Sequence, residues 1–242
     1  MYNKEIISRA ILSPFTSNFD NELARQETID GFKHGVRSIV VAPGQVDMIM
    51  EVKKQYGNGY TRAGMTVGYP FGGLSRKFKE YLTQFAIDKG IDEIDLGVNI
   101  TAIKSGDFKT AKDELCSLLK IADGKLNIIP LVWIVRIPLE LADKICQMYI
   151  DAGIKSIKTN PGIHFGDMKV EHISYLANHY GDKLLIEVAG RVRSREKAEE
   201  MTRLGASYYH MSQWRRIGGI GQDIQFDWDT KKAGFGEYTD RL

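Results

Sequence analysis

The chain has 242 residues, of which 26% are charged and 43% hydrophobic, and its formal net charge is +2. This composition excludes a disordered, collagen-like or coiled-coil chain. The near balance of 33 basic and 31 acidic residues gives no reason to expect nucleic acid or an anionic membrane as a partner.

No apolar run approaches the roughly 18 residues that a membrane-spanning helix needs. The first residues, MYNKEIISRAILSP, carry charges inside the apolar stretch and offer no cleavage site of a signal peptide. Cys116 and Cys146 fall in helical patterns without metal-binding spacing, which indicates reduced thiols. We therefore expect a cytoplasmic protein.

Short β-branched apolar runs alternate with amphipathic helical patterns along the whole chain. The expected strands span 6–12, 36–42, 61–68, 92–98, 127–135, 154–159, 183–189 and 206–212. Four glycines stand just before a strand, where left-handed helix C-caps are common. They are Gly35, Gly90, Gly153 and Gly205.

Eight strands separated by helices predict an α/β protein with a (β/α)₈ (TIM) barrel. A doubly wound open sheet is the alternative, but the segment after the first strand, SPFTSNFD, has no glycine-rich fingerprint. We expect one barrel domain over residues 1–242. Periodicity is lost from about residue 222, which indicates an irregular C-terminal tail.

Polar residues at the C-terminal ends of the strands are the candidates for chemistry in such a barrel. Because side chains alternate along a strand, Asp95 lies opposite Ile94, and Glu187 lies opposite Ile186. The apolar faces should meet the helices. We therefore expect Asp95, Glu187 and also Lys158, at the end of the sixth strand, to point into the barrel.

Lys158 allows two interpretations. A buried lysine is costly unless it is paired, so it could form a structural ion pair with a carboxylate. It could also be a Schiff-base nucleophile, which needs a neutral amine and an acid or base nearby.

Two glycine-containing loops follow the sixth and seventh strands, in the sequences KTNPG and EVAGRVR. Gly162 and Gly190 there would let backbone N–H groups approach an anion. Arg191, Arg193 and Ser212 could complete such an anion site at the end of the barrel where phosphate groups commonly bind.

The five histidines, by contrast, show no H-x-H or HExxH spacing. We expect neither a metal nor another cofactor.

Several segments together resemble the deoxyribose-phosphate aldolase family over about residues 6–213. They are VAP (41–43), TVGYPFGG (66–73), DEIDLGVNITAIKSGDF (92–108), DAGIKSIKTNPG (151–162) and EVAGRVRSREKAEEMTRLGAS (187–207). The chain is identified as a divergent member of these class I aldolases. The resemblance implies a (β/α)₈ barrel and a Schiff-base aldol mechanism without metal.

The resemblance also assigns roles. Lys158 falls on the family's Schiff-base lysine and Asp95 on its catalytic aspartate, while Gly162, Gly190 and Ser212 fall on its phosphate site. Glu187 and Arg191 depart from the family, because they replace a second lysine and a glycine. A carboxylate in place of that lysine favours the charged, non-nucleophilic amine of Lys158.

We therefore expect a carbon–carbon lyase in which Lys158 forms the iminium and Asp95 and Glu187 move protons. Gly162, Gly190, Arg191 and Ser212 would hold the anionic end of a small sugar or keto substrate, most simply a phosphate. The departures predict a substrate other than 2-deoxyribose 5-phosphate.

Two alternatives remain open. One is an isomerase or dehydratase in which Glu187 and Asp95 form the acid–base pair and Lys158 anchors an oxyanion. The other is a sugar-phosphate-binding protein with a degenerate site. In every case the expected partner is a small anionic sugar or aldehyde, with homo-oligomer formation left open.

Overall fold

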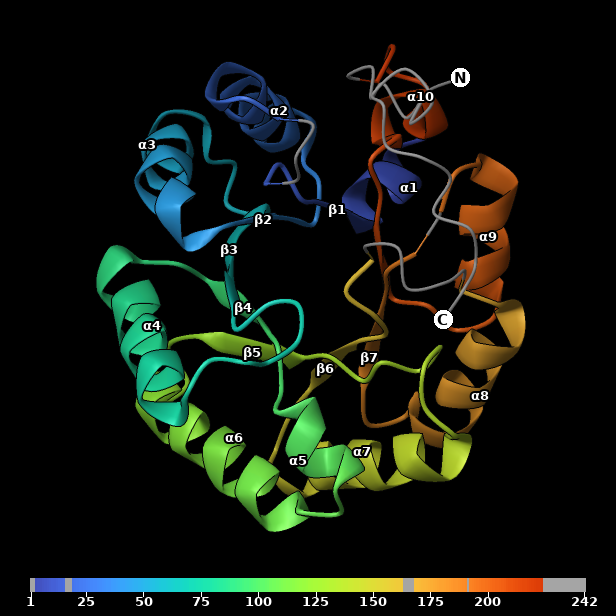
Figure 1. Cartoon of the computed structure of the whole chain (residues 1–242). Helices are drawn as coiled ribbons and strands as arrows, with labels where there is room; N and C mark the ends of the chain where they lie inside the picture. Colours follow the sequence, from blue (N-terminus) through green and yellow to red (C-terminus); the bar gives the residue numbers. More distant parts are fainter. Residues whose placement is uncertain (1–2, 16–18, 163–167, 191, 224–242) are drawn as a thin grey trace, which may run out of the picture.

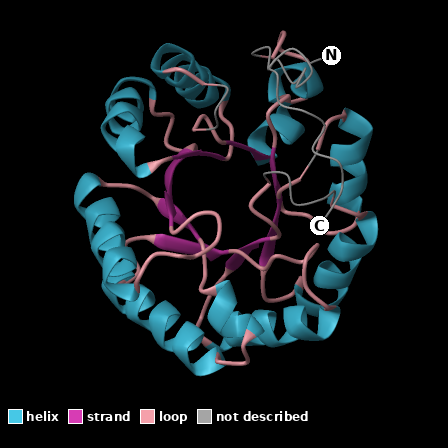
Figure 2. Ribbon diagram, viewed as in Figure 1, coloured by secondary structure: helices cyan, strands magenta, loops and turns pink. Residues whose placement is uncertain are grey.

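The protein forms a ring of eight strands enclosed by a ring of helices, as Figures 1 and 2 show. The computed structural model describes residues 3–15, 19–162, 168–190 and 192–223. Nearly all of the tail that was expected to be irregular lies outside these ranges. Within them, no helix combines the length and apolar character needed to cross a membrane.

All eight strands lie inside the predicted ranges. They are β1 (Ala10–Leu12), β2 (Ser38–Val41), β3 (Arg62–Val67), β4 (Glu93–Leu96), β5 (Asn127–Pro130), β6 (Ser156–Lys158), β7 (Leu185–Val188) and β8 (Tyr208–His210). Each pairs in parallel with its neighbours, and β1 pairs with both β2 and β8. Between β5 and β6, the Val132 N–H donates to Lys158 O at 2.9 Å, which closes the circle. The predicted (β/α)₈ barrel is confirmed.

The helices form the outer layer (Figure 2). They are α1 (Lys4–Arg9), α2 (Asn21–His34), α3 (Val46–Tyr56), α4 (Arg76–Lys89), α5 (Ile100–Lys104), α6 (Phe108–Ala122), α7 (Leu139–Asp151), α8 (Val170–Tyr180), α9 (Arg195–Arg203) and α10 (Trp214–Gly218), with a 3₁₀ turn, η1 (Pro43–Gln45), before α3. Fully buried Ile39, Ile94, Ile157 and Ile186 belong to the apolar core between sheet and helices. Their outward direction leaves the alternate residues of the same strands facing the barrel interior.

The first segment differs from its prediction. Residues 6–12 were expected to be one strand, but Lys4–Arg9 form α1, and only Ala10–Leu12 form β1. The Asn3 side chain caps this helix by accepting from the Ile6 N–H at 3.1 Å. A short apolar run is compatible with a buried helical turn as well as with a strand, so periodicity alone could not separate them.

The four glycines predicted at helix ends all have positive φ. Gly35 and Gly90 are the left-handed C-caps of α2 and α4, with φ of 72° and 77°. Gly153 and Gly205 follow the caps of α7 and α9 with φ of 90° and 102°. Only glycine adopts this conformation without strain, so the predicted helix boundaries are confirmed at these positions.

The loops that follow β3 and β4 approach each other through bare backbone. A Cβ atom on Gly72 would lie 1.7 Å from Val98 O, and one on Gly97 would lie 2.2 Å from Gly68 O. The Gly72 N–H donates to Gly68 O at 2.7 Å, which tightens the β3 loop itself. Side chains are therefore excluded from this part of the barrel mouth.

Candidate active site

A buried ion pair lies at the C-terminal end of the barrel. Lys158, the last residue of β6, places Nζ 2.5 Å from Asp95 Oδ2 on β4. The two side chains are 2% and 0% exposed. Both point into the barrel, as the strand alternation predicts, and the Tyr69 ring lies 5.4 Å from Nζ. A short charge-assisted hydrogen bond of this kind fixes the orientation of both groups.

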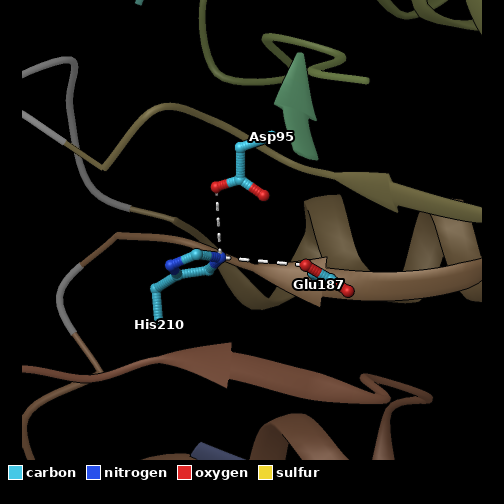
Figure 3. A group of neighbouring side chains, drawn as sticks. All are labelled: Asp95, Glu187 and His210. Carbon is cyan, nitrogen blue, oxygen red and sulfur yellow. Dashed lines mark ion pairs between the residues drawn. The ribbon is translucent and has the colours of Figure 1, made fainter. Parts of the chain in front are cut away.

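His210 and Glu187 complete the group from two further strands. Figure 3 shows the His210 ring aimed at both carboxylates, with Nε2 3.8 Å from Glu187 Oε2 and 4.0 Å from Asp95 Oδ2. These separations are too long for hydrogen bonds. Within the described part of the chain, His210 Nε2 and both Glu187 oxygens have no hydrogen-bond partner. On its other side, His210 Nδ1 lies 3.3 Å from Ser13 Oγ, just beyond β1, which fixes the ring.

A second polar layer lies deeper, nearer the N-terminal ends of the strands. Glu93, at the start of β4, accepts from Arg37 NH1 at 3.4 Å. The Arg37 guanidinium also stacks over the Tyr208 ring at 4.6 Å. This layer places an additional carboxylate and an additional cation below the Lys158–Asp95 pair.

The electrostatics of the interior favour uncharged forms of two groups. Burial raises the pKa of Glu187 well above its usual value, and the charges of Glu93 and Asp95 raise it further. Burial, with a contribution from the Lys158 ammonium, lowers the pKa of His210 well below its usual value. These shifts favour the protonated form of Glu187 and the unprotonated form of His210.

The same groups bear on metal binding. One donor atom each from Asp95, Glu187 and His210 lies within 4.8 Å of the others, a grouping that can hold a divalent cation. However, Asp95 Oδ2 already binds the Lys158 ammonium, and that positive charge opposes a metal ion beside it.

Sequence reasoning missed His210, because it considered only histidine spacing along the chain. The alternation rule would have found it. Tyr209 is fully buried and bonds to Thr202 of α9, whereas Tyr208 and His210 take the opposite, inward direction.

Of the predicted anion-binding residues, Gly162 and Gly190 come together. A Cβ on Gly162 would lie 3.6 Å from the Ala189 Cβ, and the Ala189 N–H donates to Thr159 Oγ1 at 3.0 Å. Both glycines have positive φ, 84° and 126°. The loops after β6 and β7 therefore lie side by side at the barrel mouth.

The remaining candidates for the anion site are less defined. Ser212 is exposed, two residues beyond β8. Arg193 is exposed in the loop before α9. Arg191 lies outside the described residues.

Comparison with known proteins agrees with this architecture. No family model matches the chain. Deoxyribose-phosphate aldolase from Caldicellulosiruptor saccharolyticus is 32% identical over 180 residues, which cover 74% of this chain and 80% of the relative. The enzyme of the same name from Metamycoplasma hominis is 29% identical over 203 residues, covering 84% and 90%.

Solved structures show the same fold at lower identity. The tetrameric deoxyribose phosphate aldolase from Aeropyrum pernix is 16% identical, with a TM-score of 0.81 over 89% of this chain and 90% of its own. An aldolase described as QR15 is 18% identical, with a TM-score of 0.82 over 89% and 95%.

The protein has the fold of a (β/α)₈ barrel enzyme, and its polar group lies at the C-terminal ends of the strands, where such enzymes carry their chemistry. With the sequence relatives, the particular family follows. The chain belongs to the deoxyribose-phosphate aldolase family, whose members are carbon–carbon lyases, and its function is of the aldolase type.

Proposed function

We propose that the protein is a class I aldolase in which Lys158 Nζ attacks a carbonyl carbon and forms a Schiff base. The observation that carries the proposal is the Lys158–Asp95 pair, 2.5 Å long and buried at the catalytic end of the barrel. An amine can attack only after it loses its proton, and Asp95 Oδ2 is positioned to accept it. The same carboxylate can then assist loss of water from the carbinolamine.

Glu187 has a separate role in this proposal. Burial and the charges of Glu93 and Asp95 raise the pKa of Glu187 well above its usual value, which favours its protonated form. A buried carboxylic acid of this kind can donate a proton to a developing alkoxide. Glu187 therefore serves as a proton donor for the reacting carbonyl group.

The anionic end of the substrate would bind at the paired loops after β6 and β7. Gly162 and Gly190 expose backbone there, and Arg191 and Ser212 follow β7 and β8 in the chain. Arg191 brings a guanidinium that suits a phosphate or a carboxylate. The substrate is thus a small anionic sugar or keto compound, and the reaction is its reversible aldol cleavage.

Borohydride trapping tests the Schiff base. The protein is incubated with a panel of aldehydes and ketones that includes 2-deoxyribose 5-phosphate, reduced, digested and analysed by mass spectrometry. We expect the added mass on the peptide containing Ile157-Lys158-Thr159. Undiminished trapping in Lys158→Ala would rule out this nucleophile.

A further inference from the structure

His210 holds a position that the proposed function leaves unused. Its Nε2 is buried, lies without a hydrogen-bond partner among the described residues, and faces the two carboxylates of the site. The groups that face the ring are Asp95 from β4, Lys158 from β6, Glu187 from β7 and Ser13 beyond β1.

The ring is close enough to act on a Schiff base at Lys158. Nζ and Nε2 lie within 6.5 Å of each other, because Asp95 Oδ2 is 2.5 Å from the first and 4.0 Å from the second. The carbon that must lose a proton in an iminium is two bonds from Nζ. When the substrate extends from Nζ toward His210, that carbon comes within reach of the imidazole.

The neighbouring groups are less suited to remove this proton. Asp95 Oδ2 is bound to Lys158 Nζ and serves the nitrogen. Burial and the neighbouring carboxylates favour the protonated form of Glu187, which suits it to act as a donor. His210 is unprotonated, and its contact with Ser13 orients the ring.

Resting on the proposed function, we infer that His210 is the catalytic base that converts the iminium to the enamine. The α-carbon's C–H electron pair becomes the C=C bond, the C=N electrons return to nitrogen, and the proton goes to Nε2. After the enamine attacks the acceptor aldehyde, the imidazolium returns this proton to the new alkoxide. In the cleavage direction the same steps run in reverse.

The inference is tested by separating enamine formation from Schiff-base formation. Exchange of the α-protons of acetone and acetaldehyde in D₂O is followed by NMR, and adducts on Lys158 are trapped in parallel with borohydride. His210→Asn keeps a group that can bond to Ser13 and removes Nε2, whereas His210→Gln places an amide near the Nε2 position.

We expect both variants to keep the trapped adduct while exchange falls about 10²- to 10⁴-fold, the usual contribution of a general base. In His210→Ala, added imidazole should restore part of the exchange.

Several outcomes would overturn the inference. The first is that both variants exchange the α-protons as fast as wild type. The second is that adduct formation and exchange fall equally and that imidazole restores neither. The third is that the wild type exchanges the protons of neither acetone nor acetaldehyde. Exchange that is abolished by chelation and restored by Zn²⁺ or Mn²⁺ would reassign His210 to a cation site. Exchange without a trappable adduct would refute the Schiff base and with it the iminium step, whereas the His210→Asn comparison would still show whether His210 removes the α-proton.

Discussion

Among the residues that the structure describes, two lysines are buried, and they differ in their surroundings. Lys79 on α4 is fully buried in the helical layer, and its Nζ lies 2.5 Å from Glu114 Oε1 on α6. Lys158 lies inside the barrel, with Nζ at the same distance from Asp95 Oδ2. Burial and pairing are therefore equal in the two places.

The difference lies in what else is present. Glu114 is the charged group that faces Lys79, and burial lowers the pKa of Lys79 against the opposing effect of Glu114. Around Lys158, the Glu187 carboxyl group and the His210 imidazole lie within 4.8 Å of Asp95, and neither the carboxyl oxygens nor Nε2 has a hydrogen-bond partner among the described residues. The Lys79–Glu114 pair links two helices. The Lys158–Asp95 pair lies beside Glu187 and His210, which can exchange protons, and it can therefore take part in chemistry. Burial of a lysine is by itself no mark of an active site.

The largest effect should come from replacing each lysine by methionine. Lys158→Met should lower trapping and turnover by about 10³-fold or more, because it removes the nucleophile. The matched variant Lys79→Met should keep turnover within the same order of magnitude. Reduced-adduct mass and steady-state rates measure both, and equal losses would end the distinction between the two lysines.

Breaking the Lys79–Glu114 ion pair should strongly lower the stability of the folded protein. Glu114→Ala leaves the Lys79 ammonium buried without a partner, which should cost about 3–5 kcal/mol of unfolding free energy. The double variant Lys79→Met, Glu114→Leu should recover this loss, since apolar residues replace a buried pair with little penalty. Urea unfolding gives both values, and a double variant as unstable as Glu114→Ala would contradict the prediction.

An intermediate effect is expected at the anion site, which has no counterpart beside Lys79. Arg191→Ala should weaken binding of phosphate, sulfate or substrate by about 1.5–3 kcal/mol, or roughly ten- to a hundredfold. Arg203→Ala, at the exposed C-terminal end of α9, is the control and should bind as wild type. If titrations show the same affinity in the Arg191 variant, the charged end of the substrate binds elsewhere.

The smallest effect concerns the pH dependence of stability at Glu187. A carboxyl group with a raised pKa in the folded state stabilises the protein fully below its unfolded pKa, and this contribution is lost as the pH rises towards the folded value. Glu187→Gln, which cannot ionise, should therefore gain stability over wild type above about pH 4.5, by up to about 1.4 kcal/mol per pH unit.

Thermal unfolding at a series of pH values measures this gain. The exposed variant Glu199→Gln is the control and should follow wild type throughout. A constant difference between Glu187→Gln and wild type across the series would show that Glu187 is ionised in the folded protein.

The comparison also explains what the sequence could predict. Local periodicity was sufficient to locate eight strands and the inward direction of Asp95, Lys158 and Glu187, because alternation within one strand sets that direction. It could not show which inward residues meet, since partners come from strands far apart in the chain. For this reason neither the meeting of His210 with Asp95 and Glu187 nor the closed Lys79–Glu114 pair was foreseen.

The glycine contacts between the loops after β3 and β4 make that side of the barrel mouth more tightly packed than the side formed by the loops after β6 and β7. On the β3–β4 side backbone touches backbone, and even a methyl group on Gly72 or Gly97 would collide with a carbonyl oxygen. Across the mouth, the nearest atom to a Cβ on Gly162 would be the Ala189 Cβ at 3.6 Å, an ordinary contact distance. Substitutions that change the substrate specificity of this enzyme are therefore expected in the loops after β6 and β7. A mutant library aimed at altered specificity should leave the loops after β3 and β4 unchanged.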